Sequence, residues 1–281
     1  MSLVERVQGS FDSARDPRFA EIMRSLVAHL HAFVGEVSLT EEEWAAAIEF
    51  LTRTGQKCDD KRQEFILLSD VLGASMAVID VNHPAGGTAS ESTVLGPFFV
   101  EGAPEFPLGA DISGGAAGEP CHISGTVRDE DANPVAGAIL DIWQSDESGN
   151  YDVQYPDLED PQGRGRLRTD DAGGYRFWSV RPEAYPIPHD GPVGDLLRAG
   201  GRGPMRPAHV HFKISAPGYR TLITHVFAAG DKYLDTDAVF GVKSSLITEF
   251  ARHDPGPAPD GTLRSTPFYT AEFDFRLAAA N

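Results

Sequence analysis

Two patterns of hydrophobic and polar positions divide the chain near residue 100. Before that point, apolar residues recur at three- and four-residue steps, which is typical of amphipathic helices with one buried face. The first long stripe follows Asp16 and Pro17, an N-cap residue and a proline suited to the first helical position. Its apolar members are Phe19, Ile22, Met23, Leu26, Val27, Leu30, Phe33 and Val34. The pattern therefore predicts a long helix that begins after Asp16.

Two further helices are predicted in the same part of the chain. Thr40 and Glu43 have the spacing of a capping box, and the helix that they open ends at Gly55. A third helix is predicted from Asp60 to just before Pro84, because proline disfavours helical geometry in the residue that precedes it. Three amphipathic helices of this size leave apolar faces uncovered, so we expect a second subunit to bury them.

Beyond residue 100 the pattern changes to short runs separated by turns that contain glycine or proline. The runs are Cys121–Arg128, Val135–Trp143, Arg166–Thr169, Tyr175–Val180, Ala208–Ser215, Thr221–Ala228 and Phe268–Leu277. Many short strands at this spacing favour a sandwich or a barrel. We therefore expect a mainly β chain, with a helical dimerisation region over residues 1–100 and a β domain over residues 101–281.

One of these predicted strands carries two histidines. Apolar residues alternate at positions 208, 210, 212 and 214, and His209 and His211 occupy the positions between them. Side chains two apart on a strand point to the same face, so both imidazoles can bind one metal ion. Neutral imidazole suits Zn, Cu, Fe or Ni. The alternative is a pair of half-buried histidines that bind nothing.

Composition excludes several classes of function. The formal net charge of −18 opposes binding to nucleic acid or to an anionic membrane surface. No apolar run approaches the length of a membrane span, and no apolar signal segment follows Met1. Cys58 and Cys121 are the only cysteines and form no disulfide framework, which suits a reducing compartment. We therefore expect a cytoplasmic protein.

Two tyrosines beside turn signals are candidates to complete a metal site. Tyr151 follows the predicted turn over residues 147–150, and Tyr185 lies among prolines that stiffen the backbone. A phenolate oxygen is a hard anionic ligand that matches Fe(III) best among the common metals. The alternative for each is a core tyrosine whose hydroxyl lies at the edge of the core.

Several segments that contain these residues resemble the intradiol ring-cleaving catechol dioxygenases. The matching segments are Leu140–Tyr151, the stretch around Tyr185, Arg206–His211, Thr93–Phe99 and Ala229–Leu234. The resemblance implies a β-sandwich catalytic domain preceded by a helical region that forms a homodimer, with bound lipid as a candidate further partner. It also implies a non-haem Fe(III) ion bound by Tyr151, Tyr185, His209 and His211.

Within that family, Tyr185–Leu197 and Ser75–His83 are most similar to the branch that acts on hydroxyquinol (benzene-1,2,4-triol). The implied reaction uses O2 to cleave the ring between the two vicinal hydroxyls, which gives 3-hydroxy-cis,cis-muconate or its keto form, maleylacetate. His225 stands where members that cleave plain catechol tend to have glutamine. Catechol and chlorocatechol remain alternative substrates.

The resemblance also assigns roles to individual residues. Tyr185 would be both an iron ligand and a base that takes a proton from the substrate. Arg206 would stabilise negative charge on the reacting ring. The alternative role for Arg206 is to form an ion pair at the surface. Asp80 would accept a hydrogen bond from the third hydroxyl of the substrate. The expected substrate pocket consists of Ala77, Asp80, Leu95, Gly96, Pro97, Phe98, Ile187, Pro188, Arg206, His225 and Val239; core packing is the alternative role for Leu95, Phe98 and Val239.

Two other classes of function stay open on the residues alone. One is a Zn or Fe(II) hydrolase or oxygenase, which would need a carboxylate beside the histidines in place of the tyrosines. The other is a metal-free β-sandwich binding protein with structural histidines. The agreement of many matched segments favours the dioxygenase, with a small catechol-type molecule and O2 as its substrates.

Overall fold

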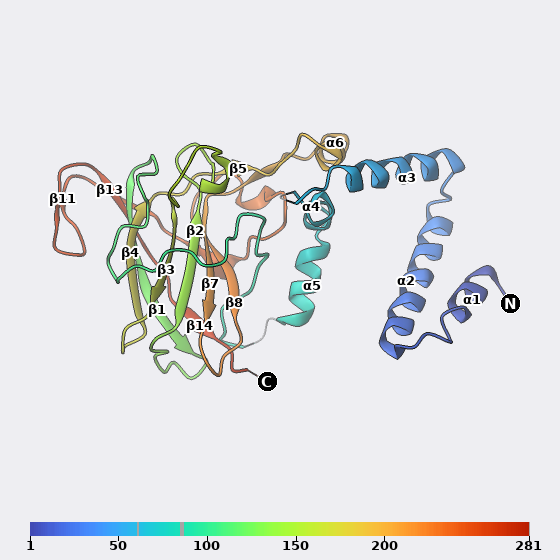
Figure 1. Cartoon of the computed structure of the whole chain (residues 1–281), viewed down its shortest axis with the longest axis horizontal. Coiled ribbons are helices and arrows are strands. Elements are labelled where there is room, and N and C mark those ends of the chain that lie inside the picture. Colours follow the sequence, from blue (N-terminus) through green and yellow to red (C-terminus); the bar gives the residue numbers. More distant parts are fainter. Residues whose placement is uncertain (61, 85–86, 281) are drawn as a thin grey trace. The chain divides into compact units, whose positions relative to one another are not determined.

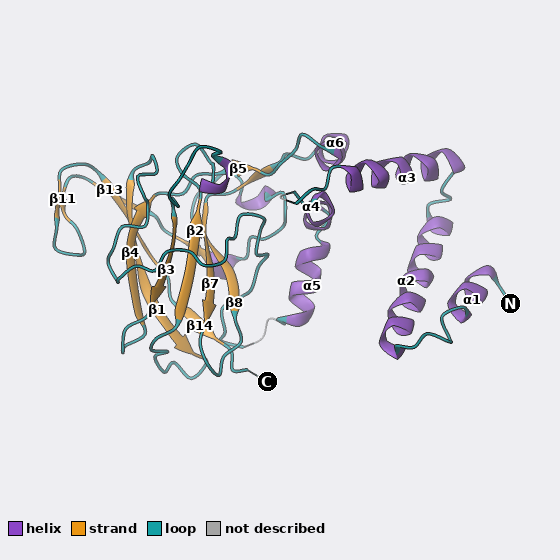
Figure 2. Ribbon diagram, in the orientation of Figure 1, coloured by secondary structure: helices purple, strands orange, loops and turns teal. Residues whose placement is uncertain are grey.

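The computed structural model describes residues 1–60, 62–84 and 87–280 (Figure 1). The chain forms two compact units, Met1–Gln56 and Lys57–Asn281. The first unit consists of helices, and the strands belong to the second (Figure 2). Among the described residues, no helix has the length and apolar character needed to cross a bilayer.

The first unit contains α1 (Leu3–Gly9), α2 (Pro17–Glu36) and α3 (Glu41–Gln56). The Asp16 carboxylate accepts the N–H of Arg18 at the start of α2, and Thr40 and Glu43 form the predicted reciprocal cap of α3. These two helices are confirmed. α1 was not predicted, although Ser2 and Glu5 also have the spacing of a capping box.

The predicted third helix is wrong as one element, because it is two helices in the second unit: α4 (Glu64–Val71) and α5 (Ala74–Asn82). Gly73 separates them with a φ of +72°, a left-handed conformation that interrupts helical hydrogen bonding. The predicted start at Asp60 also differs, since α4 begins at Glu64; Lys61 lies outside the described residues.

Contacts of α4 explain why the two units divide at Gln56, well before the boundary expected near residue 100. The buried carboxylate of Glu64 accepts the N–H of Val193 at 3.1 Å, and Arg202 donates to the carbonyl of Val71 at 2.5 Å. Val193 belongs to α6 (Pro192–Ala199), a helix that was not predicted despite the proline at its first position. α4 therefore packs with a later part of the chain.

The second unit contains the two sheets of the predicted sandwich. One sheet contains β10 (Ala251–His253), β13 (Phe268–Glu272), β1 (Pro120–Asp129), β14 (Phe275–Leu277) and β4 (Gly174–Val180). The other runs in the order β3 (Arg164–Arg168), β2 (Ile139–Gln144), β7 (His209–Ser215), β8 (Leu222–Ala228) and β9 (Ile247–Thr248). The shorter elements are β5 (Tyr185–Pro186) paired with β6 (Met205–Arg206), β11 (Gly256–Pro257) paired with β12 (Leu263–Arg264), and the 3-10 turns Asp152–Gln154, Leu234–Thr236 and Ser244–Leu246.

Two strand predictions need correction. β2 begins at Ile139, four residues after the predicted start. The run predicted as one strand to Leu277 is interrupted between β13 and β14, which pair with successive parts of β1. At the interruption the Asp274 carboxylate accepts the N–H of Thr126 on β1 at 2.7 Å.

The main hydrophobic core lies between the sheets and leaves the histidines on the other side of β7. Val210, Phe212 and Ile214 belong to this core, together with residues of β1, β2, β4, β8, β13 and β14. His209 and His211 alternate with them and therefore project from the outer face. Both are nonetheless fully buried, so other segments of the second unit must cover this face.

Candidate metal centre

Register between neighbouring strands brings three imidazoles together. β7 places His209 and His211 on the outer face, and β8 places His225 directly opposite His211. One ligand atom from each histidine lies within 4.8 Å of the others, and all three side chains are fully buried. Sequence spacing predicted the first pair, whereas the third member depends on the register of β7 and β8.

The two predicted tyrosine ligands reach the same point from separate segments. Tyr151 Oη lies 2.9 Å from His211 Nε2, which is 3.1 Å from His209 Nε2. Tyr185 lies on β5, and its ring centroid is 5.2 Å from that of Tyr151 and 5.5 Å from that of His209. The structure thus brings together all four residues proposed as ligands.

Hydrogen bonding leaves nitrogen lone pairs directed into this cluster. His209 Nδ1 donates to the Pro207 carbonyl at 2.7 Å, so its Nε2 carries a lone pair. Burial lowers the pKa of His209, His211 and His225, and nearby positive charge lowers each pKa further. Within the described residues, His225 Nε2 is buried without a hydrogen-bond partner. Neutral imidazoles with converging lone pairs fit a bound cation.

The phenol oxygens favour a particular kind of cation. Burial raises the pKa of Tyr151 well above its usual value, so without a cation this phenol stays protonated. A bound metal ion reverses that preference by stabilising the phenolate. A set of buried imidazoles with two tyrosine oxygens therefore fits Fe(III), because a phenolate is a hard anionic ligand that matches this ion.

Arg206 supplies the positive charge at the centre. It lies on β6 opposite Tyr185, and its Nη1 is 3.5 Å from Tyr185 Oη and 3.4 Å from His209 Nε2. Burial is the largest single influence and would lower the pKa of Arg206, but the charge of Asp237, the nearby Tyr185 and the hydrogen bonds to Asp237 together raise the pKa, so the guanidinium stays charged. The ion pair with Asp237 is buried, which excludes the surface ion pair considered for this arginine.

Residues 93–98 cover the histidines. Thr93 Oγ1 is 2.7 Å from His225 Nδ1, and Phe98 stacks on Tyr151 with ring centroids 4.4 Å apart. Gly96 passes so close to His211 that an added Cβ would lie 3.1 Å from its Cε1. This segment was predicted as part of the substrate pocket, and it lies directly against the metal-binding side chains.

The other predicted pocket residues differ in their surroundings. Ile187 and Val239 are buried, and Pro188 follows Ile187 just beyond β5. Ala77 and Asp80 are exposed residues of α5. The Asp80 carboxylate is 57% exposed and lies 2.8 Å from Lys243 Nζ, so the structure gives this charge an ion-pair partner. In the described part of the chain, this ion pair with Lys243 does not connect Asp80 to any proposed metal ligand.

Four residues that support the centre were missed from the sequence. Trp143, opposite His211 in the sheet, stacks on it with centroids 4.6 Å apart. Arg164 donates to the Asp152 carboxylate and to the Phe98 carbonyl, which ties the residue after Tyr151 to residues 93–98. Trp143 stands within the matched segment before Tyr151, which was a usable signal. The pairings of Asp152 with Arg164 and of Asp237 with Arg206 had no local signal.

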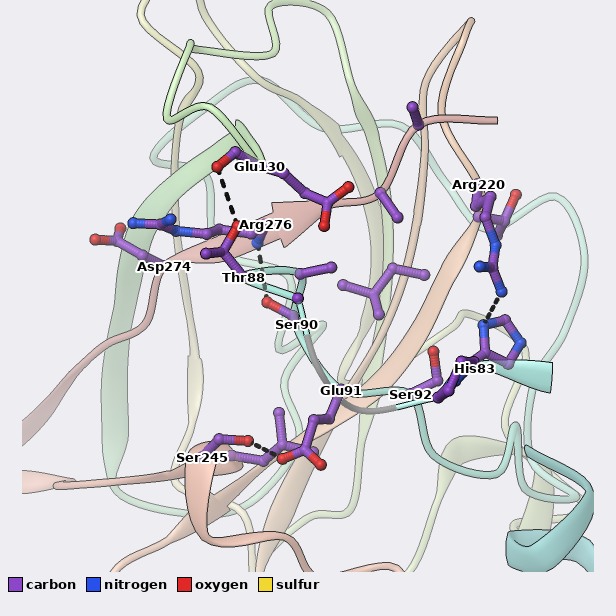
Figure 3. A pocket seen from close by; sticks show the side chains of 18 of the residues that line it. His83, Thr88, Ser90, Glu91, Ser92, Glu130, Arg220, Ser245, Asp274 and Arg276 are labelled. Atoms are coloured by element: carbon purple, nitrogen blue, oxygen red, sulfur yellow. Dashed lines mark hydrogen bonds between the residues drawn. The ribbon is translucent and has the colours of Figure 1, made fainter. Parts of the chain in front are cut away.

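A separate cavity of about 830 Å³ lies near the ends of β8 and β14 (Figure 3). Its lining includes His83, Glu91, Arg220 and Arg276, but none of the residues predicted for the metal or substrate sites. Arg220 lies 2.7 Å from His83 Nδ1, and burial and then this arginine lower the pKa of His83. The cavity mixes basic and acidic side chains and is distinct from the metal centre.

Comparison with known families agrees with this geometry. The family model described as "Catechol dioxygenase N terminus" matches residues 16–89, and the one described as "Dioxygenase" matches residues 94–279. The chain therefore belongs to the catechol dioxygenase family, whose members are intradiol ring-cleavage dioxygenases.

Several proteins that are similar to this chain are named hydroxyquinol 1,2-dioxygenases. A hydroxyquinol 1,2-dioxygenase of Rhodococcus opacus is 56% identical, with 98% of this chain and 93% of the relative covered. A hydroxyquinol 1,2-dioxygenase of Nocardioides simplex is 54% identical, with 99% of this chain and 95% of the relative covered. The crystal structure of a hydroxyquinol 1,2-dioxygenase from Pseudomonas putida has a TM-score of 0.93 at 47% identity, with 99% of this chain and 97% of that chain covered.

Proposed function

We propose that this chain cleaves hydroxyquinol with O2 between its two vicinal hydroxyls, using a non-haem Fe(III) ion, and yields 3-hydroxy-cis,cis-muconate or maleylacetate. The observation that carries this proposal is the buried cluster of Tyr151, Tyr185, His209 and His211. Similarity along nearly the full chain to proteins named hydroxyquinol 1,2-dioxygenases supports the substrate.

The ligand set provides an acceptor for one of the protons that the substrate diol releases. When bound, a ferric ion held by these residues would supply a Lewis acid that favours ionisation of the vicinal hydroxyls and reaction of the ring with O2. Tyr185 Oη takes one substrate proton as the diol binds, while Tyr151, His209 and His211 stay in place. The nearby Arg206 guanidinium, 3.5 Å from Tyr185 Oη, stabilises negative charge that develops on the ring.

Selectivity for a third hydroxyl needs a polar group at the pocket. His225 is fully buried and its Nε2 has no partner among the described residues, so it can bond a substrate oxygen. Asp80 remains a second candidate, although its exposure and its ion pair with Lys243 weaken that role. Ile187, Val239 and Phe98 would form the apolar walls.

We also propose that two copies associate through the first unit. The apolar stripe of α2 is 42–55% exposed at Phe19, Ile22, Leu26, Leu30, Phe33 and Val34. Such a stripe suits an obligate apolar interface, and lipid is a candidate occupant of any remaining apolar space. Light scattering at micromolar concentration should give a dimer, and solvent extraction followed by mass spectrometry would detect lipid. A reducing cytoplasm is the proposed compartment.

The proposed activity is tested by metal analysis together with a substrate panel. The purified protein should contain iron, should be red-brown from tyrosinate-to-iron charge transfer, and should act on hydroxyquinol in preference to catechol, 4-chlorocatechol and protocatechuate. A preference for catechol or 4-chlorocatechol would favour the alternative substrates. A colourless zinc protein, or a protein whose stability does not change on chelation, would contradict the iron enzyme.

A further inference from the structure

We propose that Asp237 positions Arg206 for the reaction and compensates its charge beside the metal centre. The inference rests on the proposed function, since it concerns how the arginine meets the substrate. Asp237 lies 31 positions from Arg206 in the sequence. Its side chain bonds to Arg206, Val239 and Gly241, and none of these is a proposed metal ligand.

The ion pair fixes the direction of the guanidinium. Arg206 Nε donates to Asp237 Oδ1 at 3.1 Å, and Nη2 donates to Oδ2 at 3.4 Å. Two of the three nitrogens are thus held on the side away from the ligands. Because the guanidinium is planar, this leaves Nη1 directed at Tyr185 and His209. Loss of the carboxylate would free the plane to rotate.

The same carboxylate holds a strained loop. Asp237 accepts the N–H groups of Val239 at 3.3 Å and Gly241 at 2.9 Å. Between them Phe240 has a φ of +57°, which a bulky residue keeps only when its surroundings enforce it. Val239 is a proposed wall of the substrate pocket. One carboxylate therefore joins the arginine to the loop that shapes the pocket.

Charge gives Asp237 a second effect. A buried guanidinium 3.4 Å from His209 Nε2 disfavours a cation at that nitrogen. Asp237 is only 5% exposed. Its carboxylate places a negative charge against the edge of the guanidinium that does not face His209. Asp237 should therefore strengthen metal binding as well as orient the arginine.

The test is a double-mutant cycle of Asp237→Asn, Arg206→Gln and the double variant, measured with hydroxyquinol. Asparagine keeps the shape of the side chain and can still accept one loop N–H, but it lacks the charge. In the wild-type background Asp237→Asn should lower kcat by about 10–100-fold, as expected for a misplaced catalytic group. In the Arg206→Gln background the same change should alter kcat by less than about 2-fold, because residues that act as a unit are not additive.

A second readout is the affinity of the iron-free proteins for Zn(II), used as the probe. Asp237→Asn should bind it about 10-fold more weakly or worse, and the double variant should return toward wild type because the uncompensated charge is gone. The matched control is Asp141→Asn. Asp141 is a buried aspartate on the neighbouring β2 that pairs with Arg166 at 2.7 Å, and its loss should lower stability without changing kcat or zinc affinity.

Equal losses of kcat in both backgrounds, or unchanged zinc affinity in Asp237→Asn, would overturn the inference. If Asp237→Asn does not fold, the comparison of Arg206→Gln with the double variant still decides it, because the proposal requires these two to have the same kcat. A wild-type protein that cleaves neither hydroxyquinol nor any other diol of the substrate panel would refute the proposed function. The zinc affinities would then still test the charge compensation separately.

Discussion

Gly96 offers a direct test of how closely residues 93–98 cover the metal centre. Its φ is +77°, and a Cβ added there would lie 3.1 Å from His211 Cε1. Gly102 has nearly the same backbone conformation, with φ at +78°, but an added Cβ meets nothing within 4 Å. The variants Gly96→Ala and Gly102→Ala therefore separate backbone strain from contact with His211.

The expected loss of stability follows from two contributions, the strain of the left-handed backbone and the contact with His211. Left-handed backbone costs an alanine roughly 1–2 kcal/mol at either position. Gly96→Ala adds a contact about 0.4 Å inside the optimal separation of two carbons, which His211 can relieve only by leaving its rotamer at about 0.5–1.5 kcal/mol. For a unit of this size each 1 kcal/mol lowers Tm by about 2–4 °C. Gly96→Ala should therefore unfold about 1–6 °C below Gly102→Ala.

The assay compares iron content, the visible charge-transfer band, kcat and Tm in the two variants. A displaced His211 or Phe98 should shift the band and lower kcat by about 10–100-fold in Gly96→Ala, since small misplacements at a catalytic centre are costly. Gly102→Ala should keep wild-type colour and kcat despite its lower Tm. Equal Tm and equal kcat in the two variants would refute the reasoning, because the contact with His211 would then impose no constraint.

Three further predictions concern ligands, selectivity and pH. Tyr151→Phe should bleach or shift the visible band and abolish activity, as absorption and oxygen-uptake measurements would show; an active variant with an unchanged band would exclude Tyr151 as a ligand. Asp80→Ala tests the second candidate for selectivity: an Asp80 carboxylate that exchanges its ion pair with Lys243 for the third hydroxyl would give a loss of about 10–100-fold in kcat/KM for hydroxyquinol, with catechol turnover and iron unchanged. Equal losses on both substrates would make Asp80 structural. Hydrogen bonds from Arg62 and then Lys57 lower the pKa of Asp190 from 3.8 to about 2. This depressed pKa means that Asp190 stabilises the fold above pH 3.8 and loses that contribution as the pH falls toward 2. Urea unfolding should thus show that Asp190→Asn destabilises at pH 6 but has little effect near pH 2.

The sequence by itself determined the local parts of this protein. Asp16 with Pro17, and Thr40 with Glu43, mark two helix starts because capping depends on residues two or three apart. The alternation around His209 and His211 placed both imidazoles on one face for the same reason, since the period of a strand is local. Family resemblance added the tyrosines, which spacing alone did not join to the histidines.

Only the tertiary structure decided which distant residues meet. His225 joins the centre because the register of β7 and β8 sets it opposite His211, and no pattern within either strand specifies that register. Asp237 meets Arg206, and Arg164 meets Asp152, across separations of 31 and 12 residues that carry no periodic signal. The sequence alone left the histidines on the outer face of β7 as either metal ligands or half-buried side chains. This face is buried because other segments fold over it, and burial is what keeps the imidazoles neutral and ready for a metal ion.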